Sequence, residues 1–96
     1  MRVISVKMLR EFWAIHPEAE GPLRAWAMVA NKSDWEKFAD IRQSYPHADQ
    51  VGKFTVFNIG GNKFRLVIVV HFNRGRLYIR HVLTHEDYDR GEWKGD

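Results

Sequence analysis

Ninety-six residues, of which 45% are apolar and 28% charged, predict one small domain spanning residues 1–96 around one hydrophobic core. The chain has no cysteine, which excludes disulfides, thiolate metal sites and thiol nucleophiles. Its net charge is +3, but residues 51–85 contain six basic and no acidic side chains, whereas residues 86–96 contain two basic and five acidic ones. This concentration of positive charge suggests a negatively charged partner.

The sequence lacks the long apolar segments of exported and membrane proteins. Its longest apolar run, Leu66 to Val70, has the length of a strand, whereas a membrane-spanning helix needs about 20 apolar residues. The N-terminal residues contain no apolar run of the kind found in signal peptides. We therefore expect a cytoplasmic protein that does not enter a membrane.

Three helices are predicted in the first half of the chain. The first begins after Ser5 as its N-cap and ends before Pro17. The second begins at residues 21–22, where a proline costs no hydrogen bond, and the third follows residues 33–34 and ends before residue 45. We expect their inward faces to anchor the core through apolar residues at helical spacing: Val6, Leu9, Trp13, Leu23, Trp26, Ala27, Ala30, Trp35, Phe38 and Ile41.

The second half of the chain has the composition of strands. Segments 53–59, 63–72 and 76–84 are rich in Val, Ile, Phe and Tyr, and glycine-containing turns separate them. This pattern is typical of an antiparallel meander, to which a short strand at residues 2–4 can add. Helices followed by strands predict an α+β fold, with the N-terminal helices packed on one face of a small, mostly antiparallel sheet.

The alternation of residues along these strands predicts which side chains share a face. We assume two-residue turns at Gly60-Gly61 and at Arg74-Gly75, because that register segregates polar from apolar residues. It places Phe57, Phe64, Leu66, Leu77, Ile79, Leu83 and His81 on the apolar face. The other face then carries Val56, Asn58, Lys63, Arg65, His71, Tyr78, Arg80, Val82 and Thr84.

The expected polar face contains several cations, and its strands supply no carboxylate to neutralise them. Phosphate suits such a surface, because guanidinium groups offer paired donors to phosphate oxygens and stay charged at any relevant pH. Two other interpretations remain open from the residues alone. The cations can pair with Glu86, Asp87 or Asp89 of the acidic segment, or they can bind an acidic protein.

Histidines in the basic segment are candidates for proton transfer. An imidazole can give or take a proton near neutral pH, as phosphodiester cleavage by an attacking hydroxyl requires. His85 follows the last expected strand, and one helical turn would bring Tyr88 to the same side of the chain. We expect no zinc site, because the predicted register puts His71 and His81 on opposite faces and no cysteine is present.

Two runs of the sequence resemble the HigB family of bacterial toxins, which belong to type II toxin–antitoxin systems and share the RelE-like fold. The first run spans residues 56–66 and contains Asn-Ile-Gly-Gly-Asn-Lys-Phe-Arg-Leu, and the second spans residues 78–89 and ends in Thr-His-Glu-Asp-Tyr-Asp. Residues 2–5, 23–26 and 38–40 extend the resemblance over nearly the whole chain.

The resemblance implies an endoribonuclease that cuts translated mRNA in the ribosome without a metal or any other cofactor. RelE-like enzymes orient a ribose 2′-hydroxyl for in-line attack on the adjacent phosphate, which leaves a 2′,3′-cyclic end. The partner implied is a HigA-type antitoxin with a helix-turn-helix domain, which would silence the toxin in a hetero-oligomer.

The resemblance also assigns roles to residues. Arg65 is implied to stabilise the charge that develops on the phosphate. His85 stands at the position of the general acid or base, where it can act as an acid, as a base or only as a positioning group. Tyr88 stands at that of a tyrosine that stacks on or orients a base. Asn58 stands where RelE has a lysine. The residues implied to bind the RNA are Asn58, Asn62, Lys63, Arg80 and Lys53.

Two other functions are compatible with the same fold. A ParE-like toxin acts on DNA gyrase and cleaves nothing, and we expect such a protein to lack the imidazole and tyrosine beside the strand arginine. A plain RNA-binding module would bind phosphate with an affinity that falls as salt rises, but would produce no cut ends.

Overall fold

The computed structural model describes residues 1–95, so Asp96 of the acidic segment lies outside the described residues. A five-stranded sheet has the order β1-β5-β4-β3-β2, in which β1 is parallel to β5 and the other pairs are antiparallel. The α+β prediction is therefore confirmed. The elements are β1 (Arg2–Ile4), α1 (Val6–Ile15), α2 (Glu20–Lys32), α3 (Phe38–Ser44), β2 (Asp49–Val51), β3 (Phe54–Ile59), β4 (Phe64–His71), β5 (Arg76–Thr84) and α4 (His85–Arg90), with short 3-10 turns at Pro17–Ala19, Phe72–Arg74 and Glu92–Gly95.

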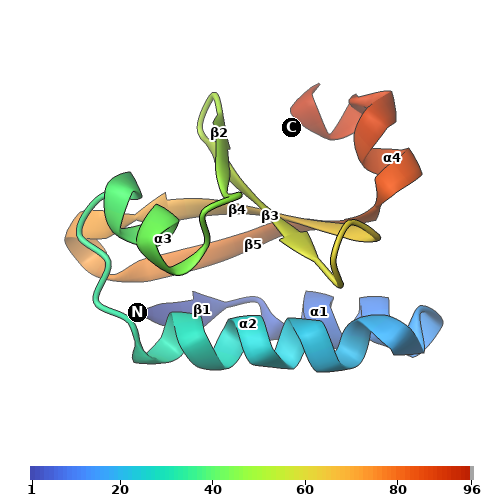
Figure 1. The fold of residues 1–96 in the computed structure, drawn as a ribbon, viewed down its shortest axis with the longest axis horizontal. Coiled ribbons are helices and arrows are strands. Elements are labelled where there is room, and N and C mark those ends of the chain that lie inside the picture. Colours follow the sequence, from blue (N-terminus) through green and yellow to red (C-terminus); the bar gives the residue numbers. More distant parts are fainter. Residues whose placement is uncertain (96) are drawn as a thin grey trace.

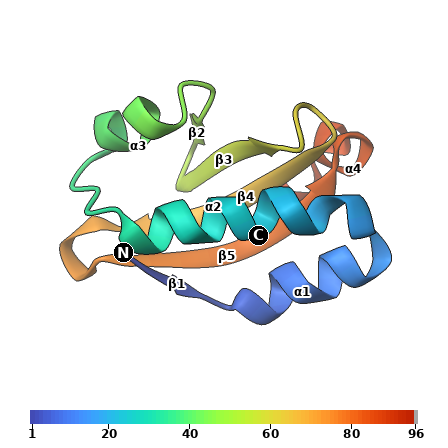
Figure 2. The same cartoon turned by 60° about the horizontal axis from the view of Figure 1, so that its bottom comes forward.

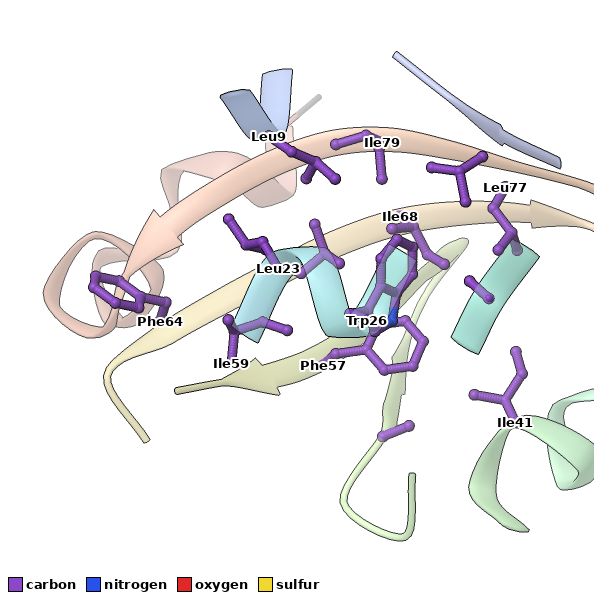
Figure 3. Close-up of a cluster of buried hydrophobic side chains, with 14 of the residues drawn as sticks. Leu9, Leu23, Trp26, Ile41, Phe57, Ile59, Phe64, Ile68, Leu77 and Ile79 are labelled. Atoms are coloured by element: carbon purple, nitrogen blue, oxygen red, sulfur yellow. The ribbon is translucent and has the colours of Figure 1, made fainter. Parts of the chain in front are cut away.

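Helices α1 and α2 cover one face of the sheet, as the sequence predicts (Figure 1). They run side by side along that face. Helix α3 lies beside β2, the edge strand at the opposite end of the sheet from β1 (Figure 2). The Trp26 ring meets the Phe57 ring edge to face at 5.4 Å in the centre of the core (Figure 3). Trp35 is also buried, but Trp13 is only partly buried and lies beneath the Arg24 guanidinium at 4.7 Å.

The helix boundaries agree with the sequence except at α3. Helix α1 begins after Ser5, although Ser5 has a left-handed backbone (φ 74°) and its side chain makes no capping hydrogen bond. Helix α3 begins at Phe38 and not after residues 33–34. The prediction is wrong there because Trp35 reaches the core from the non-helical segment before α3, where its ring packs at 6.3 Å from Tyr45.

The turn between β3 and β4 is longer than predicted. Asn58 pairs with Arg65 and Ile59 with Phe64, so the connection has four residues, 60–63, in place of two. Gly60 and Gly61 both have a positive φ, a conformation that favours glycine. The register differs by two residues and therefore keeps Asn58 and Arg65 on one face. Lys63, however, lies in the turn and not on the sheet.

A second correction concerns β5. His71 pairs with Arg76, so this connection also has four residues, and a β-bulge then lets Val67 pair with His81 and Ile68 with Ile79. The extra residue is Arg80, and it reverses the alternation of all residues after it. Val82 consequently packs on the main core, and His81 lies on the same face as Arg65, with its ring 6.3 Å from Phe54. The predicted placement of His81, Val82, Leu83 and Thr84 is therefore wrong.

The face opposite α1 and α2 is not the open polar surface that the sequence suggests. A second apolar cluster lies on it, made of Phe54, Val56, Val67 and Trp93, with Val51, Val69, Leu83 and Tyr88 packed against it. Helix α4 and the turn after it cover this part of the sheet, and β2 stands on the same side (Figure 1). Within residues 1–95, no helix has the length and apolar character needed to cross a membrane.

Candidate active site

Arg65 lies at the start of β4 with only 8% of its surface exposed. Its Nη1 donates hydrogen bonds to the backbone oxygens of Asn62 and Phe64 at 3.1 and 3.2 Å, and its Nη2 donates to Asn62 Oδ1 at 2.9 Å. All three acceptors are neutral, so these bonds fix the guanidinium without neutralising its charge. A buried and oriented positive charge is suited to binding an anion.

An aromatic stack from the C-terminal segment holds the other side of Arg65. The guanidinium carbon lies 5.4 Å from the centre of the Tyr88 ring, which is within cation–π distance. Tyr88 in turn stacks on Trp93, with ring centres 5.0 Å apart and planes 16° from parallel. Trp93 Nε1 donates to the Tyr88 backbone oxygen at 2.9 Å. The three side chains therefore form a fixed column from strand to C-terminal turn.

The start of α4 is joined to the β3–β4 turn. Thr84 caps the helix by accepting a hydrogen bond from the Asp87 amide at 3.1 Å. The His85 amide donates to the Lys63 backbone oxygen at 3.0 Å. This bond ties His85 to the turn that also carries Asn62, and Asn62 holds Arg65. Three separate segments of the chain thus meet at one place.

His85 is oriented by a residue of its own helix. Its Nδ1 lies 3.0 Å from Asp89 Oδ2, within hydrogen-bond distance, and about half of each side chain is exposed. A carboxylate at Nδ1 favours a proton on that nitrogen and leaves Nε2 to exchange protons with a bound molecule. Asp87 pairs with Arg90 in the same helix, so the two carboxylates have partners within α4.

The phenol of Tyr88 is harder to ionise than a free tyrosine. Burial is the main cause that raises its pKa above 10.0, and the negative charges of Asp49 and Asp89 add to the rise, against a smaller lowering by Arg65. Tyr88 is therefore a neutral hydrogen-bond donor at physiological pH. It is not suited to act as a tyrosinate base.

This pKa shift can be measured directly. We expect the difference in tyrosinate absorbance between the wild-type protein and Tyr88→Phe to titrate at a higher pH than free tyrosine does. Burial also raises the pKa of Tyr45, so Tyr45→Phe is the matched comparison and should remove a different late-titrating group. A difference that titrates at or below pH 10.0 would contradict the buried stack at Tyr88.

The structure brings some of the remaining predicted residues to this site and not others. Asn58 lies directly across from Arg65, and Asn62 and Lys63 lie in the adjoining turn. Lys53 lies beyond the aromatic cluster, with its ammonium 5.2 Å from the Phe54 ring. Arg80 lies three residues before Leu83, the cross-strand partner of Arg65, which places the two β5 residues roughly 10 Å apart along the strand. Arg80 lines a separate depression with Ser5 and His71.

Comparison with protein-family models identifies the family of the chain. Residues 19–91 match the model of a family described as the HigB toxin, the RelE-like toxic component of a toxin–antitoxin system. The chain belongs to the HigB toxin family. This membership confirms the resemblance seen in the sequence, and it implies an antitoxin as a partner of the chain.

Named relatives of the HigB family cover most of the chain. An mRNA interferase toxin HigB from Escherichia coli and an mRNA interferase HigB from Shigella flexneri are each 33% identical over 92 residues, which are 93% of this chain and 88% of the relative. A further mRNA interferase HigB from Escherichia coli is 25% identical over 93 residues, which are 94% of this chain and 90% of the relative.

Two residues of this candidate site were not anticipated from the sequence. Trp93 supports the Tyr88 ring, and its only signal was a large aromatic residue in an otherwise polar C-terminal segment. Asp89 lies four residues after His85, a spacing that places both on one face of a helix. Among residues 1–95, no group of three or more His, Asp or Glu side chains is arranged to hold a metal ion.

Proposed function

We propose that the chain is an mRNA interferase, an endoribonuclease toxin that cuts mRNA by attack of a ribose 2′-hydroxyl on the adjacent phosphate. The main support for the proposal is the environment of Arg65, a nearly buried cation that is held by neutral acceptors and contacts the Tyr88 ring. The names of the relatives from Escherichia coli and Shigella flexneri support the same activity.

The proposed reaction uses charge stabilisation and proton transfer. The 2′-oxygen forms a bond to phosphorus while the bond to the 5′-oxygen breaks, which leaves a 2′,3′-cyclic phosphate and a 5′-hydroxyl. Negative charge grows on the phosphoryl oxygens in the transition state. The hydrogen bonds of Arg65 within residues 1–95 use at most three of its five N–H groups, which leaves two to bind those oxygens.

His85 is the proposed proton-transfer group. Its Nε2 can take the proton of the attacking 2′-hydroxyl or give one to the leaving 5′-oxygen. Tyr88, neutral at physiological pH, is proposed to orient a base next to the cut through its hydroxyl, because Arg65 and Trp93 already lie against its ring. Asn62, Lys63 and Lys53 are proposed to bind the RNA backbone, with Asn58 across from Arg65 and Arg80 at the far end of the surface.

We further propose the setting in which this reaction takes place. Residues 1–96 form one toxin domain that acts in the cytoplasm on mRNA in the translating ribosome, and a HigA-type helix-turn-helix antitoxin silences it in a hetero-oligomer. The ribosome supplies an ordered single strand, and the six cations of residues 51–85 provide the charge that attracts it.

Induction of the wild-type chain in cells tests the activity. We expect growth arrest together with new 5′ ends inside translated messages, and neither effect in cells that carry an empty vector. Arrest without new ends would overturn the nuclease and favour the ParE-like action on DNA gyrase. Binding to ribosomes without new ends would favour an RNA-binding module that performs no chemistry.

The pair formed by His85 and Asp89 makes a separate prediction. We expect Asp89→Asn to slow cleavage by about 3- to 10-fold, because His85 loses the carboxylate that orients its ring. In a His85→Ala background the same change should have little further effect, since the two residues act together. Glu86→Gln, which removes an exposed carboxylate at the start of the same helix, is the control. Equal effects of Asp89→Asn in both backgrounds would contradict the positioning role.

A further inference from the structure

A cavity of about 490 Å³ lies next to the site and has no part in the reaction described above. One wall is the connection between α3 and β2, residues 45–48, and the other is formed by β3 and the β3–β4 turn. Its size falls within the range of small-molecule pockets in proteins. The residues that matter for its chemistry are Tyr45, His47, Phe57, Asn58 and Asn62.

The cavity exists because β2 is shorter than β3. Strand β2 pairs with β3 only at residues 54–56, so residues 57–59 have a neighbouring strand on one side only. Beside this unpaired part of β3, the rings of Tyr45 and Phe57 form the apolar wall of the cavity. The Tyr45 ring meets the buried Phe57 ring edge to face at 5.2 Å, and the Tyr45 amide donates to the Ile41 oxygen at 2.8 Å. The apolar wall is therefore formed before any ligand binds.

The cavity and Arg65 share a residue. Asn62 lines the cavity, and its Oδ1 accepts the 2.9 Å hydrogen bond from Arg65 Nη2. That bond turns the Asn62 amide so that its NH₂ group is left to donate elsewhere. Asn58, the cross-strand partner of Arg65, lines the cavity as well. A molecule whose phosphate lies on Arg65 thus has its adjoining part at the mouth of the cavity.

The walls supply the contacts by which proteins hold an unstacked base. Aromatic side chains offer flat faces, here Tyr45 and the exposed His47 ring. Amide side chains match the edges of a base, here Asn58 with a donor and an acceptor and Asn62 with the NH₂ group that its bond to Arg65 leaves available. Among residues 1–95, those that line the cavity include no carboxylate or ammonium group. A neutral, flat, polar-edged ligand fits this combination.

We propose that this cavity binds one unstacked nucleobase of the RNA, next to the phosphate held by Arg65, and thereby selects the sequence at which the chain cuts. The proposal rests on the proposed function, because it requires an RNA phosphate at Arg65. It assigns specificity to residues 45–48 and Asn58, and leaves the chemical step to Arg65, His85 and Tyr88.

Base frequencies around the cut sites test the proposal. We expect ends mapped after induction of the wild-type chain to be enriched in one base at one fixed position. His47→Ala and Asn58→Ala should each reduce that enrichment by about fivefold or more, without altering the enrichment at other positions. The matched controls are His71→Ala and Asn73→Ala, which change an exposed histidine and an exposed asparagine at the other end of the sheet.

The outcomes separate this proposal from the proposed function. If the wild-type chain makes no ends, the nuclease proposal fails and this one fails with it. If the cavity variants cut with the wild-type base profile, only the nucleobase site is wrong. Variants that keep the base profile but lose the antitoxin would show that the cavity binds a protein segment instead.

A binding measurement tests the cavity even if a variant no longer cleaves RNA. Nucleoside 5′-monophosphates added to purified wild-type protein should shift the His47 imidazole resonances, and Asn58→Ala should abolish these shifts whereas Asn73→Ala should not. Absence of any shift in the wild-type protein at millimolar nucleotide would overturn the proposal.

Discussion

Replacement of Arg65 by alanine is expected to lower the rate of mRNA cleavage by about 10²- to 10³-fold, the usual cost of removing one oriented donor from a developing oxyanion. The change removes the only guanidinium that the structure fixes against both Asn62 and Tyr88 among residues 1–95. Arg65→Lys keeps the charge but loses the planar fork, so we expect it to restore only part of the activity. The measurement is the rate at which a defined cut appears in a ribosome-bound message.

The control for this change is Arg74→Ala, which removes an exposed arginine of the same basic segment at the far end of the sheet. It should cut at nearly the wild-type rate. Since Arg65 is nearly buried, thermal unfolding of both variants must be measured alongside the rate. Full cleavage by a folded Arg65→Ala protein would remove the central residue of the proposed site.

Trp93→Ala is the second change with a large expected effect. Trp93 is 4% exposed, stacks on the Tyr88 ring and meets the Phe54 ring edge to face at 5.6 Å. Loss of a buried tryptophan lowers the free energy of unfolding by about 3–5 kcal/mol. We expect cleavage to fall as well, because Tyr88 loses the ring that supports it, and α4, which carries His85, loses part of the packing that holds it against the sheet.

Trp13→Ala separates these two consequences. Trp13 is partly buried on the face of the sheet covered by α1 and α2, away from the site. It should lower stability without lowering cleavage by the folded protein. Hydrogen exchange should show faster exchange of the α4 amides in Trp93→Ala, but not in Trp13→Ala. Normal cleavage and unchanged α4 protection in Trp93→Ala would contradict the role given to the aromatic stack.

Local patterns in the sequence predicted much of the fold. Strands β1 and β5 have the predicted boundaries, and the alternation in β3 and β4 correctly places Asn58 and Arg65 on one face. These features follow from properties of neighbouring residues, namely apolar spacing and turn-forming glycines. The turn at residues 60–63 was predicted two residues too short, because a pair of glycines permits several turn lengths.

The bulge at Arg80 could not be read from the sequence. No glycine or proline marks it, and it depends on how β5 must bend to pair with β4 while its end carries α4. Its effect is large, since it moves His81 and Leu83 to the face of Arg65. The prediction of an open polar face is wrong for a related reason. No pattern in the residues next to Trp93 indicates that its ring packs back onto β3 and β4.

The candidate site was predicted in part. The residues alone make Arg65, His85 and Tyr88 candidates, and the resemblance implies their roles. The structure brings Arg65 and Tyr88 into contact and ties His85 to the turn beside them. Their roles in cleavage stay predictions. The residues alone left open an interpretation in which the acidic segment neutralises the basic face, but Asp87 and Asp89 of that segment have partners within α4. These ion pairs arise because their members lie three or four residues apart in one helix, which the net charge of the segment does not show.

The chemical identity of the cut ends shows which oxygen attacks the phosphate. Purified wild-type protein is incubated with ribosomes on a defined message, and the new ends are analysed, with Arg65→Ala as the inactive control. We predict a 2′,3′-cyclic phosphate on the upstream fragment and a 5′-hydroxyl on the downstream one, since the 2′-oxygen is the proposed nucleophile. A 5′-phosphate on the downstream fragment, or the absence of any cut by the folded wild-type protein, would contradict the account.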